Sequence, residues 1–121
     1  MPANERMSMA EQELRQQLLS ISQQLLELGL NRGSSGNASV RAGDDMLITP
    51  SALPVSVMTP DSMVRMDLPG NVLQAGQPSR EWRFHRDILA ARREIGAVIH
   101  APCSCGGKRF LNSAMFHGPE M

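Results

Sequence analysis

The chain has 121 residues, about the length of one domain, and its 12 Lys and Arg residues balance its 12 Asp and Glu residues. A formal net charge of zero argues against a nucleic-acid-binding protein that acts through bulk charge, because such proteins carry a basic excess to neutralise phosphates. Apolar residues make up 41% of the chain, too many for a wholly disordered protein, and aromatic residues only 3%, so we expect an aliphatic core.

The sequence also indicates the cellular compartment of the protein. No apolar run approaches the roughly 20 residues of a membrane-spanning helix, and residues 1–13 lack the apolar stretch of a secretory signal. The two cysteines, Cys103 and Cys105, are too few and too close to form a disulfide framework. These features predict a soluble, cytoplasmic protein in a reducing environment, with no membrane partner.

The first predicted element is a helix behind a flexible tail of residues 1–8. Ser8 and Glu11 have the spacing of a capping box, and Gly29 is expected to end the helix, with Leu30 folding back on Leu25. Apolar residues then recur with helical spacing at Leu14, Leu18, Ile21, Leu25 and Leu28.

Two short hairpins are predicted next. Residues 38–41 and 46–48 are expected to pair across a turn at 43–45, and residues 63–66 and 72–73 across a turn that contains Pro69 and Gly70. Pro78 and Ser79 should open a second helix that runs to about Glu94 and has Ser79 as its cap.

A short buried strand at residues 97–99, ending in His100, completes the predicted elements. The order of helix, two hairpins, helix and strand predicts a mixed α/β, α+β-like architecture. Residues 101–121 show no helix or strand period, and we expect them to form a divergent C-terminal tail.

Three loops are rich in small polar donors. In residues 33–37, glycines allow backbone N–H groups to approach an anion and Ser and Asn add donors, although a plain helix-to-strand loop has the same composition. Residues 49–52 place hydroxyls at the end of a strand, where ligands often bind, or simply mark a strand broken by Pro50. Residues 79–81 combine a helix start with Arg80, which suits an anion, but ordinary capping explains them equally.

Two titratable groups are candidates for chemistry. Glu81 and His85 are four residues apart on one helix face, either as a catalytic or metal-binding pair or as a solvated surface pair. His100 at the end of its strand can bind a metal or be structural. A zinc site whose spacing matches no common module is also arithmetically possible from His100, Cys103, Cys105 and His117.

Four segments occur together in a specific order: GNASVR at 36–41, MLITPS at 46–51, SREWRFH at 79–85 and AVIH at 97–100. Over about residues 10–100 the sequence resembles the class II aldolase/adducin family, the group of the L-fuculose-phosphate aldolases. The resemblance implies a central, largely antiparallel sheet flanked by helices, and a homo-oligomer that is usually a tetramer. It also implies zinc or another divalent metal, and a small phosphorylated sugar or related carbonyl compound as substrate.

The resemblance assigns a role to seven residues. Glu81 matches the catalytic acid/base, and His100 matches the first metal-binding histidine. The substrate-binding positions, which include an arginine where the family has its second serine, are Gly36, Asn37, Ser51, Ser79 and Arg80.

The sequence departs from the family after His100. The metal motif of the family is His-x-His, and position 102 here is Pro102, which has no ligand atom in its side chain. A further family histidine falls beyond Met121. We therefore expect residues 9–100 to be the N-terminal part of such a domain, in an apparently truncated fold, with a frame-shifted end as one explanation of residues 101–121.

The function implied by the resemblance is that of a metal-dependent aldolase-type lyase. A metal would polarise the carbonyl of a small sugar phosphate and stabilise the enediolate, and Glu81 would carry the proton. Epimerase and dehydratase relatives use a similar logic, so the reaction type stays open. The alternative is a non-catalytic, adducin-like or truncated assembly module that has lost the metal site.

Overall fold

The structure is a computed structural model that describes residues 3–28, 36–74, 76–103 and 107–110, with side chains described from residue 10 to residue 100 in these ranges. No helix among these residues is long and apolar enough to cross a membrane. The helices are α1 (Ala3–Glu27) and α2 (Trp82–Ala91), with 3-10 turns η1 (Val55–Val57) and η2 (Pro60–Ser62). The strands are β1 (Asn37–Ala42), β2 (Asp45–Ile48), β3 (Val64–Asp67), β4 (Ala97–Cys103) and β5 (Gly107–Phe110).

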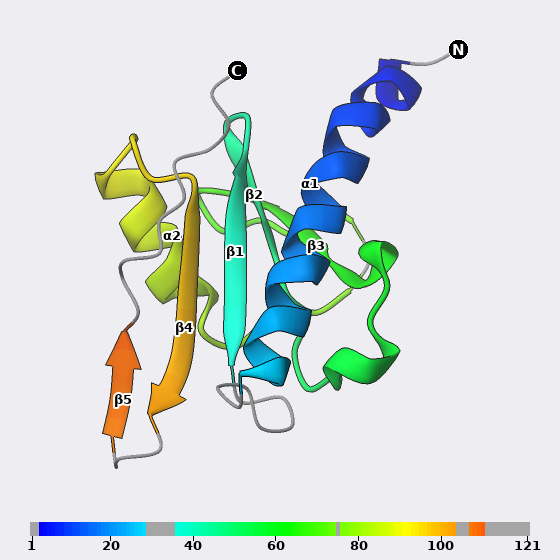
Figure 1. The fold of residues 1–121 in the computed structure, drawn as a ribbon. Coiled ribbons are helices and arrows are strands. Elements are labelled where there is room, and N and C mark those ends of the chain that lie inside the picture. Colours follow the sequence, from blue (N-terminus) through cyan, green and yellow to red (C-terminus); the bar gives the residue numbers. More distant parts are fainter. Residues whose placement is uncertain (1–2, 29–35, 75, 104–106, 111–121) are drawn as a thin grey trace.

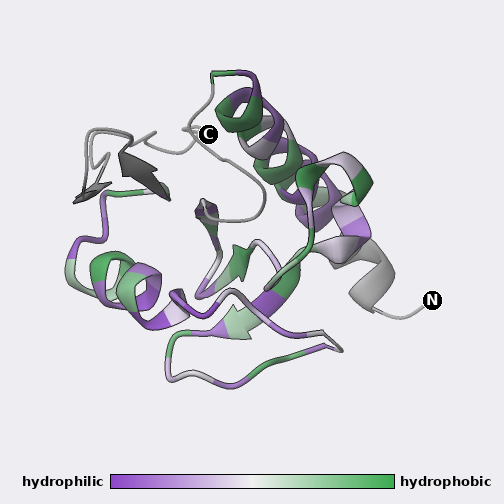
Figure 2. Ribbon diagram, turned by 90° about the horizontal axis from the view of Figure 1, so that it is seen from below, coloured by the Kyte–Doolittle hydropathy of each residue, from purple (hydrophilic) through white to green (hydrophobic). Residues whose placement is uncertain are grey.

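The five strands form one sheet in the order β3-β2-β1-β4-β5, and every neighbouring pair is antiparallel. The sheet lies between the two helices, with α1 on one side and α2 on the other (Figures 1 and 2). This arrangement confirms the predicted mixed architecture with a central antiparallel sheet flanked by helices.

The two-residue period of the strands divides the core into two layers. On the α1 side, Ala38 and Val40 of β1 pack in one cluster with Leu18, which is fully buried. On the α2 side, Met46 and Ile48 of β2, Val64, Met66 and Val98 cluster with the fully buried Leu89. Each fully buried leucine contributes about 1.5–3 kcal/mol relative to an exposed one.

The first helix differs from the prediction at both ends. It begins at Ala3, inside the expected tail, and it ends at Glu27, one residue before Leu28. Leu18 and Leu25 are buried as the stripe predicts, but Leu28 is 71% exposed because it lies beyond the last helical residue. The expected cap at Ser8 has no described side chain, and Gly29 and Leu30 lie outside the described residues.

The first predicted hairpin is present and the second is formed in part. The chain turns between β1 and β2 at Gly43 and Asp44, and Gly43 has a φ of 65°, in the left-handed region that glycine adopts without a Cβ penalty. In the second hairpin, the Leu73 N–H donates to the Arg65 carbonyl (2.8 Å) and the Asp67 N–H to the Asn71 carbonyl (3.0 Å). Met66 and Val72 form an isolated bridge, and residues 72–73 are not a strand.

The predicted start of the second helix is wrong. The helix begins at Trp82 with Glu81 at the N-cap position, and it ends at Ala91, short of Glu94. The Ser79 N–H donates to the Thr49 carbonyl (3.0 Å), which holds this part of the chain against the segment after β2. Ser79 therefore does not cap the helix, and its Oγ accepts the Glu81 N–H instead (3.1 Å).

The strand expected at 97–99 continues well past His100. β4 extends to Cys103, and β5 pairs with it so that His100 lies opposite Phe110 and Pro102 opposite Lys108. Residues 101–121 show no strand period in the sequence because β5 has only four residues, too few to produce a visible alternation.

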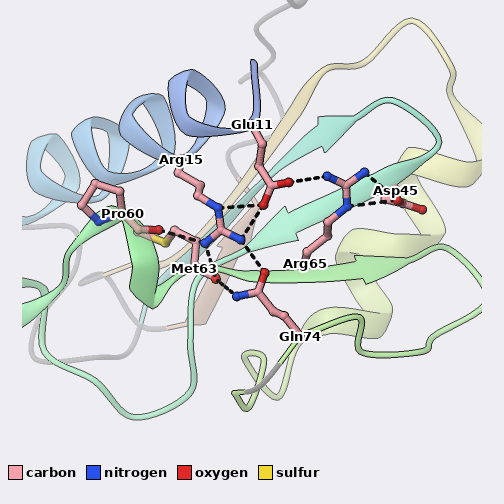
Figure 3. A network of polar contacts seen from close by, with 7 residues as sticks. All are labelled: Glu11, Arg15, Asp45, Pro60, Met63, Arg65 and Gln74. Atoms are coloured by element: carbon pink, nitrogen blue, oxygen red, sulfur yellow. Dashed lines mark hydrogen bonds and ion pairs between the residues drawn. The ribbon is translucent and has the colours of Figure 1, made fainter. Parts of the chain in front are cut away.

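A polar network fixes α1 to the sheet (Figure 3). Arg15 is buried and donates through Nη1 to the carbonyls of Pro60 (3.0 Å) and Met63 (2.9 Å). Glu11 accepts from Arg15 and from Arg65, each at 2.6 Å. The network also includes Gln74 beside Arg15 and Asp45 beside Arg65. It therefore joins α1, η2 and the β2–β3 pair.

Candidate active site

The segments that carry the candidate residues meet at the start of β1. Asn37, the first residue of β1, lies opposite His100 in the register with β4. The Thr49 Oγ1 accepts the Ala38 N–H (3.2 Å), and the Thr49 carbonyl accepts the Ser79 N–H (3.0 Å). The loop after β2 and the loop before α2 are therefore both fastened to this end of the sheet.

Glu81 lies beside His100 at the N-terminal end of α2. The Oε1 atom of Glu81 is 3.9 Å from the Nδ1 atom of His100. The Glu81 side chain is 41% exposed, whereas that of His100 is 8% exposed. The ring of Phe84 lies next to the His100 ring, with centroids 4.9 Å apart. The N-terminus of a helix suits an acidic side chain, and here a half-exposed carboxyl group lies next to a buried imidazole.

His85 points away from Glu81 and into the α2 side of the sheet. It is fully buried, with Nδ1 2.7 Å from the Ser39 Oγ and Nε2 2.5 Å from the Asn37 Oδ1. Burial, and secondarily the nearby His100, lower the pKa of His85 to about 3, so the ring is neutral near pH 7.

The structure thus rejects both interpretations of Glu81 and His85 as a pair. His85 is neither a solvated surface residue nor a partner of Glu81, because both of its ring nitrogens contact polar atoms of β1. Sequence reasoning missed Ser39 and this role of His85. The signal that points to Ser39 is its position two residues after Asn37, which places both on one face of β1.

The remaining substrate-binding candidates lie around the same loops. Ser79 is buried, and the Ser51 N–H donates to the Gln77 carbonyl (3.0 Å), which brings the two loops side by side. Arg80 is exposed at the surface, and Gly36 directly precedes Asn37. The structure therefore brings Asn37, Ser79, Glu81 and His100 to one place, with Ser51 on the adjoining loop.

The candidate metal ligands do not form a complete site. Within the described part of the chain, no group of three or more His, Cys, Asp or Glu side chains could hold a metal ion. Glu81 and His100 offer two donors, whereas catalytic zinc sites use three protein ligands. Cys105 and His117 of the alternative zinc site lie outside the described residues, as does the side chain of Cys103.

The fold and the site together define an α/β domain with a polar, partly exposed site at one end of an antiparallel sheet. Residues 16–105 match the family described as the Class II Aldolase and Adducin N-terminal domain. The chain belongs to this family, as the four sequence segments predict.

Two kinds of known protein are similar to this chain. A 5-methylthioribulose-1-phosphate/5-deoxyribulose-1-phosphate aldolase of Rhodospirillum rubrum is 49% identical over 87 residues, which are 72% of this chain and 39% of the relative. An L-fuculose phosphate aldolase of Escherichia coli is 38% identical over 92 residues, 76% of this chain and 43% of the relative. The chain therefore spans about two fifths of the length of these relatives.

Solved structures show the same relationship. An L-fuculose 1-phosphate aldolase superposes with a TM-score of 0.69 at 36% identity and covers 74% of this chain and 43% of that structure. An l-fuculose-1-phosphate aldolase from Thermus thermophilus superposes with a TM-score of 0.60 at 27% identity, over 69% of this chain and 43% of that structure.

Proposed function

We propose that this chain carries the N-terminal part of the active site of a lyase that cleaves a small phosphorylated ketose. The observation that supports the proposal is the meeting of Asn37, Ser79, Glu81 and His100 at one end of the sheet. Relatives named as aldolases of fuculose and methylthioribulose phosphates support the reaction class.

The reaction needs a group that moves protons. In a ketose 1-phosphate with its carbonyl at C2, aldol cleavage breaks the C3–C4 bond. The C4 hydroxyl loses its proton and becomes the aldehyde, while the electron pair of the broken bond forms an enediolate. The enediolate takes a proton at C3 and leaves as dihydroxyacetone phosphate. Glu81 is the group that we assign to these proton movements, because its carboxylate is accessible and is held at a helix N-terminus.

The phosphate needs donors, and the same end of the sheet supplies them. The Asn37 amide, the Ser79 and Ser51 hydroxyls and the backbone at Gly36 are neutral donors, and the exposed Arg80 adds a positive charge. A set of neutral donors with one cation suits a phosphate monoester, because it binds the dianion without placing a fixed charge in the buried part of the site.

The family resemblance also implies zinc or another divalent metal with His100 as one ligand. Glu81 and His100 alone do not fit a complete site, so the steps assigned here are those of the chain's own residues. A homo-oligomer, which the resemblance implies, and a cytoplasmic location, which the sequence features predict, belong to the same proposal.

The second candidate is a non-catalytic module of the same family, which the incomplete set of metal donors in the described residues favours. The experiment that separates the two uses the full chain with L-fuculose 1-phosphate and 5-methylthioribulose 1-phosphate, with and without added zinc, and measures release of dihydroxyacetone phosphate. Turnover supports the lyase. Binding of dihydroxyacetone phosphate without turnover supports the module.

Glu81→Gln tests the assigned residue, since glutamine keeps the size of the side chain and removes the transferable proton. We expect turnover to fall about 10²- to 10⁴-fold, the usual contribution of a general acid–base group. Glu13→Gln, the same change at an exposed position of α1, should leave turnover unchanged. Equal activity of both variants would remove Glu81 from the mechanism.

A further inference from the structure

We propose that His85 is a positioning residue that holds the Asn37 side-chain amide in one orientation, with its nitrogen presented to the ligand. The inference depends on the proposed function only in taking a phosphate ester as that ligand. Three residues carry it, Ser39 and Asn37 on one face of β1 and His85 on α2, and they are 0%, 7% and 0% exposed.

The orientation of the Asn37 amide, with its Oδ1 toward His85, assigns the donor of each hydrogen bond. The Oδ1 of Asn37 can only accept, so the Nε2–H of His85 donates to it across 2.5 Å. A neutral imidazole carries one proton, which leaves Nδ1 as the acceptor of the Ser39 Oγ–H at 2.7 Å. The structure therefore specifies the Nε2–H tautomer of a neutral ring.

This tautomer determines what Asn37 presents to the site. Its oxygen is bound to His85, so the amide nitrogen carries the donors that remain for a ligand. The opposite orientation would turn an oxygen toward an anion, and its NH₂ group could donate to His85 only in the Nδ1–H tautomer, with the Ser39 Oγ accepting that ring proton. That alternative satisfies His85 and Ser39 but presents an acceptor to the phosphate, so the position of the ring proton reports which way the Asn37 amide faces.

The backbone on both sides keeps this geometry in place. Asn37 is the first residue of β1 and is paired with His100 in β4, and Ser39 lies two residues later in the same ladder, paired with Val98. His85 is in the first half of α2, whose Leu89 packs one turn later in the α2-side core. The side chains are therefore attached to a sheet and a helix, which position groups more rigidly than loops do.

A histidine that merely fills the core would show the same burial, so the tests must measure the orientation of Asn37. The first is NMR of the ¹⁵N-histidine-labelled full chain near pH 7, which distinguishes a protonated from an unprotonated ring nitrogen. We expect His85 to be neutral with its proton on Nε2. A proton on Nδ1, or on both nitrogens, would overturn the inference, and this measurement needs no variant that has to fold.

The second test compares dissociation constants for dihydroxyacetone phosphate. His85→Asn keeps an amide near Ser39 but is too short to reach Asn37, and we expect binding to weaken about tenfold or more. His85→Gln places an N–H donor where Nε2 lies in the native ring, and we expect it to restore most of the affinity. Asn37→Asp retains the acceptor for His85 but exchanges the ligand-facing donor for an anionic oxygen, so it should abolish binding.

Ser22→Ala is the matched control, because it removes a buried side-chain hydrogen bond on α1, from the Ser22 Oγ to the Leu18 carbonyl (3.0 Å), and changes none of the three residues. We expect its dissociation constant to stay within about threefold of the native value. A loss as large as that of His85→Asn would overturn the inference in favour of general packing. If the native chain binds no dihydroxyacetone phosphate, the proposed function fails, and the tautomer alone then decides the role of His85.

Discussion

Replacing Arg15 by methionine should destabilise the fold more than its position on a surface helix suggests. The Arg15 side chain is only 8% exposed and contacts α1, η2 and Gln74 (Figure 3). Methionine has a similar apolar stem, so Arg15→Met preserves most of the packing and removes the donors.

The magnitude follows from what each former partner retains. The Met63 carbonyl still accepts from the Gln74 Nε2 (3.2 Å), and the Pro60 carbonyl still accepts the Met63 N–H (3.3 Å). Glu11 still has Arg65. Because the two carbonyls and Glu11 each keep a partner, and Gln74, whose Oε1 loses its donor, is only partly buried, the cost is near the lower end of 1.5–3 kcal/mol for each of two charge-assisted bonds to carbonyls, or about 3 kcal/mol in total.

The assay is urea unfolding of the full chain, followed by fluorescence of Trp82, the single tryptophan, and by far-ultraviolet circular dichroism. Arg92→Met is the control, because its ion pair with Glu94 involves side chains that are 62% and 55% exposed. We expect the control to change the unfolding free energy by no more than about 0.5 kcal/mol. A loss for Arg15→Met as small as that of the control would refute the view that this network holds α1 to the sheet.

Two further predictions concern pH and metal. Burial, followed by the nearby His100, lowers the pKa of His85 from 6.5 to about 3, so the unfolded chain binds a proton that the folded chain does not bind. The stability that depends on this group is complete above pH 6.5 and is lost as the pH falls toward 3, at up to about 1.4 kcal/mol per pH unit. In His85→Gln, the free energy of unfolding measured between pH 6.5 and 3 should depend less on pH. Zinc titration under reducing conditions should show no tight stoichiometric site, since Glu81 and His100 supply two donors. Tight binding that disappears in a Cys103→Ser, Cys105→Ser double variant would instead support the alternative Cys/His site.

The order of the elements and the two core layers could be predicted from the sequence, because both depend on local periodicity. Leu18 and Leu25 follow the spacing of a helix, and the two-residue period separates Val40 from Ser39. The start of α2 could not be predicted in this way. It depends on a hydrogen bond from Ser79 to Thr49, thirty residues earlier in the chain, and tertiary contacts of this kind override a local capping pattern.

The residues of the candidate site also divide into those that the sequence indicates and those that depend on tertiary contacts. Glu81 and His100 were singled out by residue type and by resemblance, and the structure places them 3.9 Å apart, although their roles remain predictions. The link from His85 to Asn37 spans 48 residues and joins a helix to a strand. Nothing in the local sequence around either residue indicates it.

The composition of β1 shows why this face of the sheet differs from an ordinary core. Its α1-side positions are apolar throughout, at Ala38, Val40 and Ala42, whereas its α2-side positions are polar throughout, at Asn37, Ser39 and Arg41. Such alternation is typical of a strand with one solvated face, yet here the polar face lies beneath α2, and Asn37 and Ser39 are buried.

Burying these polar side chains costs free energy unless each has a partner, and each has one. Arg41 donates to the carbonyls of Leu89 (2.7 Å) and Arg92 (3.1 Å), so it satisfies groups at the C-terminal end of α2. At the other end of α2, Ser39 and Asn37 bond to His85. Arg41 serves the helix itself, but apolar residues would hold the N-terminal half of α2 against the sheet equally well. The polar set at that end is what the role proposed for Asn37, a donor beside Glu81 and His100, requires.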